Sequence, residues 1–470
     1  MGAKREWAHD CLHKAVDAKD IWSMVKMRKG QTTNTFPPLR DVANQLVDKP
    51  EDKANIFHNK FFPSMPLIVT TRQPNDPPPC PTHQWAKITA DDVTYALQST
   101  STTLAPGPSR VGYTILKWTH TACPEVLTEL FNICLDTGTH PWKHATIVIL
   151  NKPNKPDYSV PKVYHPIVLM ECMGKVLERI VAKWVNNDIE EYGLLLMSQF
   201  GSRLAHCVVD AITTLVHRIQ ATRATNNAGA LLLFDISGFF NNVNLERAAH
   251  VLGNLGFPEN VHKWMLSFLQ GCTATLWIRD HSSQIFPINN RTLQGSPLLP
   301  ILSALYTTSL LDIAKTWVHK DLTLYVNDSA IYATLATTMA ATEAALNGYK
   351  EVLGWLQANS LNTNLSKTKL MTFTQQRANP DIVGGPNMEA RYNDPIRGHC
   401  TVQTVTHLRY LGVYIDHSLK WDRQVSIMTN HARSTIWGIN LLGNSVCGLN
   451  FLNWRKVYNA LVIPTLTYGM

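Results

Sequence analysis

The chain has 470 residues, of which 45% are hydrophobic and 17% are charged, and its formal net charge is +8. This composition is that of a globular protein and excludes an intrinsically disordered chain. The length predicts two to four structural units, and the modest basic excess is compatible with a nucleic-acid partner.

The cysteines and the apolar stretches narrow the class of protein further. Nine cysteines without a Cys-X-X-Cys pair give neither a zinc signature nor a disulfide framework. We therefore expect reduced, mostly buried thiols in an intracellular protein of the nucleus or cytoplasm. The polar N-terminus is unlike a secretory signal. The longest uncharged stretch, 292–311, contains Gln, Gly and Pro, so no membrane span is expected.

Residues 1 to about 60 are predicted to be polar and partly helical. One candidate helix covers 10–27, and a second begins at Pro50 and runs to Phe62. The Pro-rich residues 63–81 predict an extended linker. Thr89 is the expected N-cap of the helix that follows.

From Thr146 onward, short β-type runs alternate with amphipathic stretches. Strands are predicted at 146–150, 230–236, 275–278, 322–326, 330–333 and 370–374. Helices are predicted at 171–192, 207–224, 245–255, 298–316 and 338–359. Residues 377–400 predict a loop, and the chain beyond His417 is predicted to be helical again. This interleaving predicts an α/β or α+β core.

Two segments place carboxylates where strands end. Asp235 follows the apolar run of ALLLFDI (230–236), where a buried carboxylate is costly unless it is paired. An N-cap role for the next helix is the simple alternative. Asn327 and Asp328 lie between two apolar runs, which is typical of a hairpin, and an ordinary polar turn would explain them alone.

Together the two segments indicate more than either does alone. A strand-end Asp235 and a hairpin-tip Asp328 can converge in one antiparallel sheet. Converging carboxylates bind Mg²⁺, which prefers carboxylate oxygens and substrate phosphates. Two such ions about 4 Å apart stabilise the attacking and leaving oxygens of phosphoryl transfer.

These two segments resemble motifs A and C of reverse transcriptases, and the other motifs follow in the family's order. The matching segments are Asn151 to Pro156, Tyr164 to Ile167, Gln199 to Arg203, Leu293 to Leu298 (motif B), Leu361 to Phe373 (motif D) and His407 to Val413 (motif E). No single motif is decisive, but the ordered set is specific and covers nearly the whole chain. The chain therefore resembles the polymerase part of a LINE-type, or non-LTR, retrotransposon protein.

The resemblance implies an α+β, right-hand polymerase fold with an antiparallel palm sheet, helical fingers and a helical thumb. The expected parts are a helical and linker segment (1–90), an N-terminal fingers extension (91–145), fingers and palm (146–416) and a thumb (417–470). No endonuclease or ribonuclease H segment is recognisable, and the end at Met470 resembles an interruption inside a longer protein, as in a truncated copy.

The resemblance also implies an activity and a set of roles. The activity is RNA-directed DNA synthesis with Mg²⁺, or Mn²⁺ in its place, on an RNA template with a DNA primer and dNTPs. Asp235 and Asp328 would hold the metal, with Asn327 beside them in the catalytic motif. The implied nucleotide-binding residues are Phe240 (the steric gate against ribose), Gln294, Gly295, Lys367, Lys152 and His165. The implied primer grip is Tyr410, Leu411 and Gly412.

Several of these residues also have plain structural explanations. Phe240 would serve equally as a core aromatic, and Gly295 as the turn that opens a helix. Solvated surface positions would explain Lys152, His165 and Lys367, and an ordinary strand would explain the segment at Tyr410.

The chain departs from the family's pattern at informative positions. The departures are Asn327 and Asn241 in place of Asp, His165 in place of Arg, Leu293 in place of Pro and Leu299 in place of Ser. Each is reachable by one C-to-T or G-to-A change, which predicts a degenerate copy that decayed by transition mutation. Because an amide removes a negative charge that the metal needs, Asn327 predicts a loss of rate on the order of 10²–10³.

Two alternatives remain open from the sequence. In the first alternative, the chain is a catalytically dead remnant that binds nucleic acid without chemistry. Primer extension compared with RNA binding distinguishes this remnant from an active polymerase. A group II intron-type polymerase would also suit Asp235 to Phe240, although the LINE-like flanks favour the first interpretation.

Overall fold

The computed structural model describes residues 37–62, 79–152, 155–237, 244–278, 281–288, 295–359, 361–375, 389–394, 397–440 and 451–469. The chain forms two compact units, one from Phe36 to Thr404 and one whose described part runs from Val405 to Gly469. The predicted helix at 10–27 and most of the predicted linker at 63–81 lie outside the described residues.

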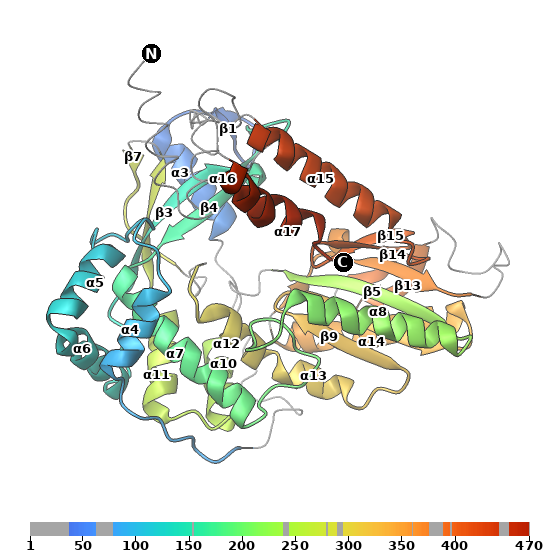
Figure 1. Ribbon diagram of the computed structural model, residues 1–470, viewed down its shortest axis with the longest axis horizontal. Coiled ribbons are helices and arrows are strands. Elements are labelled where there is room, and N and C mark those ends of the chain that lie inside the picture. Colours follow the sequence, from blue (N-terminus) through green and yellow to red (C-terminus); the bar gives the residue numbers. More distant parts are fainter. Residues whose placement is uncertain are drawn as a thin grey trace. The chain divides into compact units, whose positions relative to one another are not determined.

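The first unit is organised around an antiparallel central sheet (Figure 1). Its strands are β5 (Ala228–Ser237), β9 (Lys320–Tyr325), β10 (Asp328–Leu335), β11 (Asn362–Thr363) and β12 (Lys369–Phe373). The order is β11-β5-β10-β9, and β12 also pairs with β5. All six predicted strand segments form strands of this sheet or of the second sheet, because their apolar and β-branched residues fit a pleated, buried surface.

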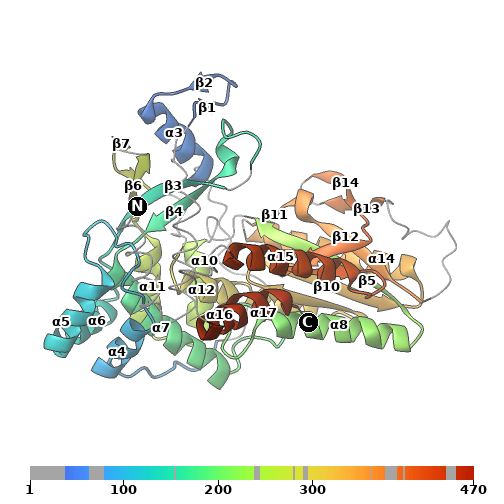
Figure 2. The same ribbon diagram turned by 45° about the horizontal axis from the view of Figure 1, so that its top comes forward.

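The two faces of the central sheet are covered by different helices (Figure 2). Helix α14 (Thr338–Ala358) packs on the face that carries Leu232 and Phe234, and the Phe234 ring lies 5.2 Å from Tyr349 of α14. Helix α8 (Val208–Ala224) covers part of the opposite face, where the Tyr332 hydroxyl donates to Thr222 at 2.9 Å. Side chains alternate between faces along a strand, so Asp235 and Asp328 lie on the face opposite to α14.

A second sheet in the same unit is built from β3 (His144–Asn151), β4 (Tyr164–Leu169), β6 (Thr273–Ile278), β7 (His281–Ser282) and β8 (Phe286–Pro287). Strand β3 pairs antiparallel with β4 and parallel with β6. Helix α3 (Pro50–Phe61) packs on it, with Phe57 fully buried against Tyr164. The predicted helix from Pro50 is thus confirmed.

A helical region with its own apolar core completes the first unit. Its helices are α4 (Ala90–Gln98), α5 (Tyr113–Ala122), α6 (Pro124–Asp136), α7 (Cys172–Glu191), α10 (Leu245–Asn254), α11 (Glu259–Leu269) and α12 (Leu299–Tyr306), and α13 (Thr308–Ala314) follows. Thr89 caps α4 as predicted, since its hydroxyl accepts the Asp92 amide and Asp92 accepts the Thr89 amide. The single helix predicted over 298–316 is two helices that meet at Thr307.

The loop predicted over 377–400 is wrong for its described part. Strands β13 (Glu389–Asp394) and β14 (Gly398–Gln403) form an antiparallel hairpin. Ala390, Tyr392 and Val402 bury one face of it in the core that includes α14. A short pair, β1 (Leu39–Arg40) and β2 (Leu46–Val47), lies near the start of the described chain.

The second unit is a hairpin followed by helices, as predicted beyond His417. The hairpin consists of β15 (His407–Tyr410) and β16 (Val413–Asp416). Helices α15 (Asp422–Asn440), α16 (Phe451–Val457) and α17 (Ile463–Leu466) follow, with a π-helical turn, η3 (Tyr458–Val462), between the last two. Across the described part of the chain, none of the helices combines the length and the apolar character that crossing a membrane requires.

Candidate active site

Asp235 and Asp328 lie directly opposite each other on neighbouring strands. The β5–β10 register pairs their Cα atoms, and such pairs are about 4.5–5.5 Å apart. The cross-strand neighbours Leu233 and Ala330 follow on the same face, so both carboxylates project from one end of one face. The predicted convergence of the two segments is therefore confirmed, although β5 continues two residues beyond Asp235 to pair with β11.

The hairpin that carries Asp328 has an unusual turn. Tyr325 pairs with Asp328, which leaves Val326 and Asn327 as a two-residue loop. Val326 has φ +57°, whereas the sequence predicted that Val326 would end the strand and that Asn327 and Asp328 would form the turn. A β-branched residue rarely adopts positive φ because its side chain crowds the backbone. The turn is therefore held in a strained conformation at the position between the two strands.

A lysine balances the charge of the carboxylate pair. Lys367, in the 3₁₀ turn η2 (Leu365–Lys367), places its Nζ 2.9 Å from Oδ2 of Asp235. Partial desolvation and the neighbouring Asp235 charge raise the pKa of Asp328, and the Lys367 ammonium opposes this rise. Two carboxylates side by side disfavour the doubly charged state, so this end of the sheet favours a bound cation.

The surroundings of Asn327 provide a hydrogen bond for its backbone carbonyl but none, within the described chain, for its side-chain oxygen. Its backbone carbonyl accepts the Ile236 amide at 2.9 Å, which ties the turn to β5. Its side-chain oxygen is buried, and within the described chain no hydrogen bond reaches that oxygen. A buried acceptor without a partner is costly, and a cation is one group that would satisfy it.

The residue types at this end of the sheet fit a divalent cation. Asp235, Asp328 and the amide oxygen of Asn327 are the hard oxygen donors that Mg²⁺ prefers. Within the described ranges, no three His, Cys, Asp or Glu side chains gather at one point as a metal ligand set.

The turn of motif B is held by a buried carboxyl group, that of Glu178, which the sequence analysis missed. Gly295 has φ +108°, and the next residue, Ser296, donates its hydroxyl to Glu178 of α7 and accepts the Leu298 amide at 3.1 Å. Glu178 is 1% exposed, and burial raises its pKa to about 7. A signal was present in the sequence, since Glu178 interrupts the apolar stripe of α7.

The other predicted residues are spread over several elements. Lys152 follows the end of β3, and its Nζ donates to the Lys162 carbonyl at 2.8 Å. His165 lies exposed on β4, where it pairs with Leu150 of β3. Leu299 is buried at the start of α12. Phe240, Asn241, Leu293 and Gln294 lie outside the described residues.

The segment predicted as the primer grip forms a tight hairpin in the second unit. Tyr410 ends β15, Leu411 and Gly412 have φ +47° and +88°, and Val413 begins β16. Positive φ at both central residues is the type I′ geometry that joins twisted strands. The Tyr468 hydroxyl donates to the Leu411 carbonyl at 2.9 Å and fixes the turn.

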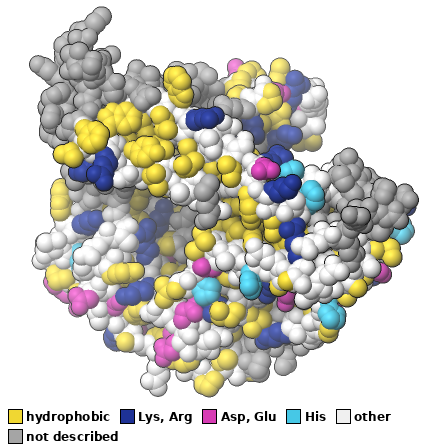
Figure 3. Space-filling view, turned by 45° about the vertical axis from the view of Figure 1, so that its right-hand side comes forward, with side chains coloured by type: hydrophobic (Ala, Val, Ile, Leu, Met, Phe, Trp, Pro, Cys, Tyr) yellow, Lys and Arg dark blue, Asp and Glu magenta, His cyan; other side chains and the backbone are white. Residues whose placement is uncertain are grey.

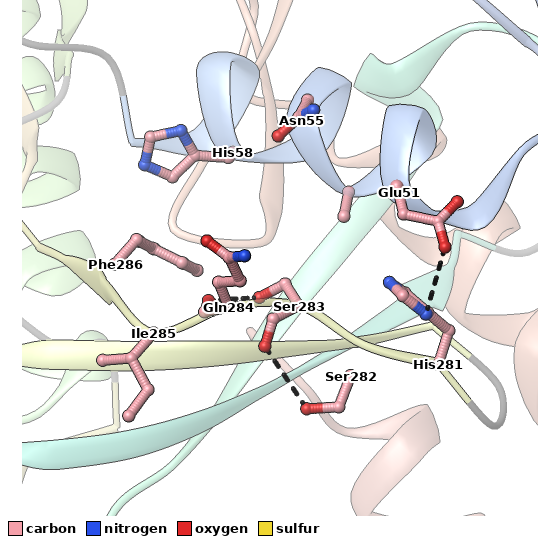
Figure 4. Close-up of a pocket in the computed structure, with 10 residues that line it drawn as sticks. Glu51, Asn55, His58, His281, Ser282, Ser283, Gln284, Ile285 and Phe286 are labelled. Carbon is pink, nitrogen blue, oxygen red and sulfur yellow. Dashed lines mark hydrogen bonds and ion pairs between the residues drawn. The ribbon is translucent and has the colours of Figure 1, made fainter.

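A separate cavity of about 580 Å³ lies between α3 and the β7–β8 segment (Figure 4). At one end His281 lies 3.8 Å from Glu51, and at the other the His58 and Phe286 rings meet edge to face at 4.5 Å. None of the residues predicted from the motifs lines this cavity. The cavity is therefore distinct from the carboxylate pair.

The comparisons with known proteins identify the family of the chain. The family model for reverse transcriptase (RNA-dependent DNA polymerase) matches residues 150–415, which is more than half of the chain. The chain therefore belongs to the reverse transcriptase family. The matched region contains Asp235, Asp328, Lys367 and the motif B turn.

Several curated relatives are proteins of mobile elements from Drosophila melanogaster. The chain is 23% identical to the probable RNA-directed DNA polymerase from transposon X-element of Drosophila melanogaster, across 99% of this chain and 49% of that protein. It is 24% identical to the probable RNA-directed DNA polymerase from transposon BS (96% and 50%) and 22% identical to the RNA-directed DNA polymerase from mobile element jockey (98% and 52%), both also from Drosophila melanogaster. The chain thus spans about half the length of the curated relatives it matches.

Proposed function

We propose that this chain is the polymerase part of a non-LTR retrotransposon reverse transcriptase, with Asp235 and Asp328 as its metal-binding carboxylates. The observation that carries the proposal is their direct pairing across β5 and β10 at one end of an antiparallel sheet, in a chain of the reverse transcriptase family. In this proposal the central sheet is the palm, the second sheet and α4–α7 belong to the fingers, and residues 417–470 are the thumb.

The side chains divide the work. Asp235 and Asp328 hold the cation site, and when bound, divalent ions supply the positive charge that nucleotidyl transfer requires. Lys367 neutralises Asp235 in the free protein and turns to the triphosphate when a dNTP binds. Gly295 and Gln294 contact the incoming nucleotide and template, and Phe240 excludes ribonucleotides. Lys152 and His165 lie near phosphate or template, and residues 410–412 grip the primer.

Asn327 limits this activity. Its buried, unpartnered side-chain oxygen supports a position next to the cation site. A neutral amide there leaves two carboxylates to balance the charge of the cations and of Lys367. Losing one preorganised electrostatic group typically costs on the order of 10²–10³ in rate. We therefore propose an impaired polymerase.

Primer extension in an Asn327→Asp background tests the assignment of Asp235. An RNA template with an annealed DNA primer, dNTPs and Mg²⁺ should give extension in this background, and Asp235→Asn should abolish it. Asp321→Asn is a matched control on the same sheet, because Asp321 lies on β9 in an exposed ion pair with Arg218. Equal extension by the Asp235→Asn and control proteins would remove Asp235 from the site.

A second function, binding nucleic acid without chemistry, is favoured by Asn327 alone. In the face shown in Figure 3, Lys and Arg side chains form several separate groups, and in this second function contacts from such side chains to phosphates would hold the nucleic acid. Tight binding of an RNA–DNA hybrid with no extension, even after Asn327→Asp, would select this function.

A further inference from the structure

A short segment before α8 covers the outer edge of the hairpin that carries Asn327 and Asp328. Ser198 accepts the Leu324 amide at 2.9 Å, and Phe200 donates to the Leu324 carbonyl at 2.9 Å. Strand β9 is the last strand in its sheet order. Residues 198–200 therefore satisfy backbone groups that an edge strand would leave open.

Gly201 continues this segment into direct contact with the strained turn. A Cβ atom built on Gly201 would lie 2.4 Å from the Val326 amide nitrogen, 2.8 Å from Val326 Cγ2 and 2.9 Å from the Tyr325 carbonyl carbon. Two of these three atoms are backbone atoms, so a rotamer change cannot remove the clash. Any side chain at position 201 would push the turn away from its place.

The turn needs such support because its own sequence disfavours its conformation. Val326 at φ +57° is a β-branched residue in the left-handed region. Residues in such conformations persist only where the surroundings fix them. The Tyr325–Asp328 pair and the Ile236–Asn327 hydrogen bond hold the turn from the sheet side, and Gly201 closes the opposite side.

The segment is itself anchored at both ends. Gln199 is fully buried, its Nε2 donates to the Thr307 hydroxyl at 3.4 Å, and its Oε1 accepts the Gly201 amide at 3.3 Å. Arg203 forms two hydrogen bonds with Glu190 of α7, at 2.7 and 3.0 Å. The position of Gly201 is therefore set by contacts with the helical region as well as by the backbone hydrogen bonds to Leu324.

We propose that Gly201 is a positioning residue: it holds the Val326–Asn327 turn so that the adjoining carboxylate of Asp328 faces Asp235 in the geometry that binds a cation. This inference rests on the proposed metal-dependent function. Residues 198–201 would thus act on the cation site through the position of the hairpin and not through contact with metal or nucleotide.

The test uses the full chain with Asn327→Asp as the background and measures Mn²⁺ affinity by electron paramagnetic resonance of free Mn²⁺. Gly201→Ala should weaken Mn²⁺ binding on the order of 10- to 100-fold, as does loss of a group that orients metal ligands. In primer extension it should lower kcat and leave KM for the RNA–DNA hybrid unchanged. Gly354→Ala is the control, since Gly354 is exposed on α14 with open space around its Cβ position.

Val326→Gly supplies the second test, because it adds no bulk and suits positive φ. It should keep or raise the melting temperature and still weaken Mn²⁺ binding, since the turn is then no longer confined. If Gly201→Ala fails to fold, Val326→Gly decides alone. Unchanged Mn²⁺ affinity in the folded variants would overturn the positioning role. Absence of Mn²⁺ binding in the background and in the Gly354→Ala control would instead overturn the metal site, and this inference with it.

Discussion

The raised pKa of the Glu178 carboxyl predicts how the free energy of unfolding changes with pH, and this prediction does not depend on catalysis. Burial raises its pKa from 4.5 to about 7 in the folded chain, while in the unfolded chain it ionises near its ordinary value. Between these two pKa values the folded state holds one more proton than the unfolded state. The stability associated with Glu178 is therefore fully present below pH 4.5 and is lost as pH rises through about 7.

The expected size follows from the shift in pKa. Each unit corresponds to about 1.4 kcal/mol, so the free energy of unfolding should fall by roughly 3 kcal/mol from this group alone. Glu178→Gln keeps the shape and an acceptor for Ser296 and removes the titration. The difference in unfolding free energy, variant minus parent, should rise by roughly that amount between pH 4.5 and 8.

Urea unfolding followed by circular dichroism at a series of pH values measures this difference. Other ionisable groups contribute equally to both proteins and cancel. Glu129→Gln is the matched control, because Glu129 is exposed on α6 and meets solvent in both states. A Glu178→Gln difference as flat as that of the control would contradict the raised pKa and would mean that Glu178 stays charged beside Lys175 and Arg179.

Three further predictions concern charge and the sugar gate. Lys367→Gln should lower the melting temperature at neutral pH without divalent ions, because the repulsion between Asp235 and Asp328 is then unbalanced. Mn²⁺ should raise the melting temperature of this variant more than that of the parent. Equal Mn²⁺ responses of the two proteins in differential scanning fluorimetry would contradict this prediction. Binding of an RNA–DNA hybrid, measured by fluorescence anisotropy, should weaken steeply with salt through counterion release, and a flat response from low to physiological salt would exclude a phosphate-binding surface. In the Asn327→Asp background, Phe240→Ala should admit ribonucleotides in primer extension, since the ring is predicted to occupy the 2′-hydroxyl position; unchanged discrimination would make Phe240 a core residue.

The sequence predicted most of the first unit because its strands and helices follow simple apolar periods. The runs around Leu232 and Ile331 predicted buried strands, and the carboxylates at the ends of these strands predicted that Asp235 and Asp328 can converge. The hairpin at 389–403 was missed because its buried residues, Ala390, Tyr392 and Val402, are few and lie among Gly, Asn and Arg. Packing against α14 decided its structure, and local composition could not.

The fine structure of the site was less predictable, since it depends on contacts between residues far apart in the chain. A valine at positive φ contradicts its own propensity, so the sequence placed the turn one residue too late. Gly201 and Val326 are 125 positions apart, and Glu178 and Ser296 are 118 apart. The break at Thr307 arises where hydroxyls of Thr307 and Thr308 bond to carbonyls of the preceding turn. No local sequence pattern predicts that Gly201 meets Val326 or that Glu178 meets Ser296.

In the proposed function, Asp235 and Asp328 form a metal-dependent polymerase site that Asn327 weakens. The most direct measurement is the single-turnover rate of one dNTP addition to a DNA primer on an RNA template with Mg²⁺, in the unmodified chain and in Asn327→Asp. The unmodified chain should show little or no incorporation, and the rate in Asn327→Asp should be higher by at least about 10², with hybrid affinity nearly unchanged. Equal rates in the two proteins, whether both robust or both absent, would mean that Asn327 does not limit the activity of this site.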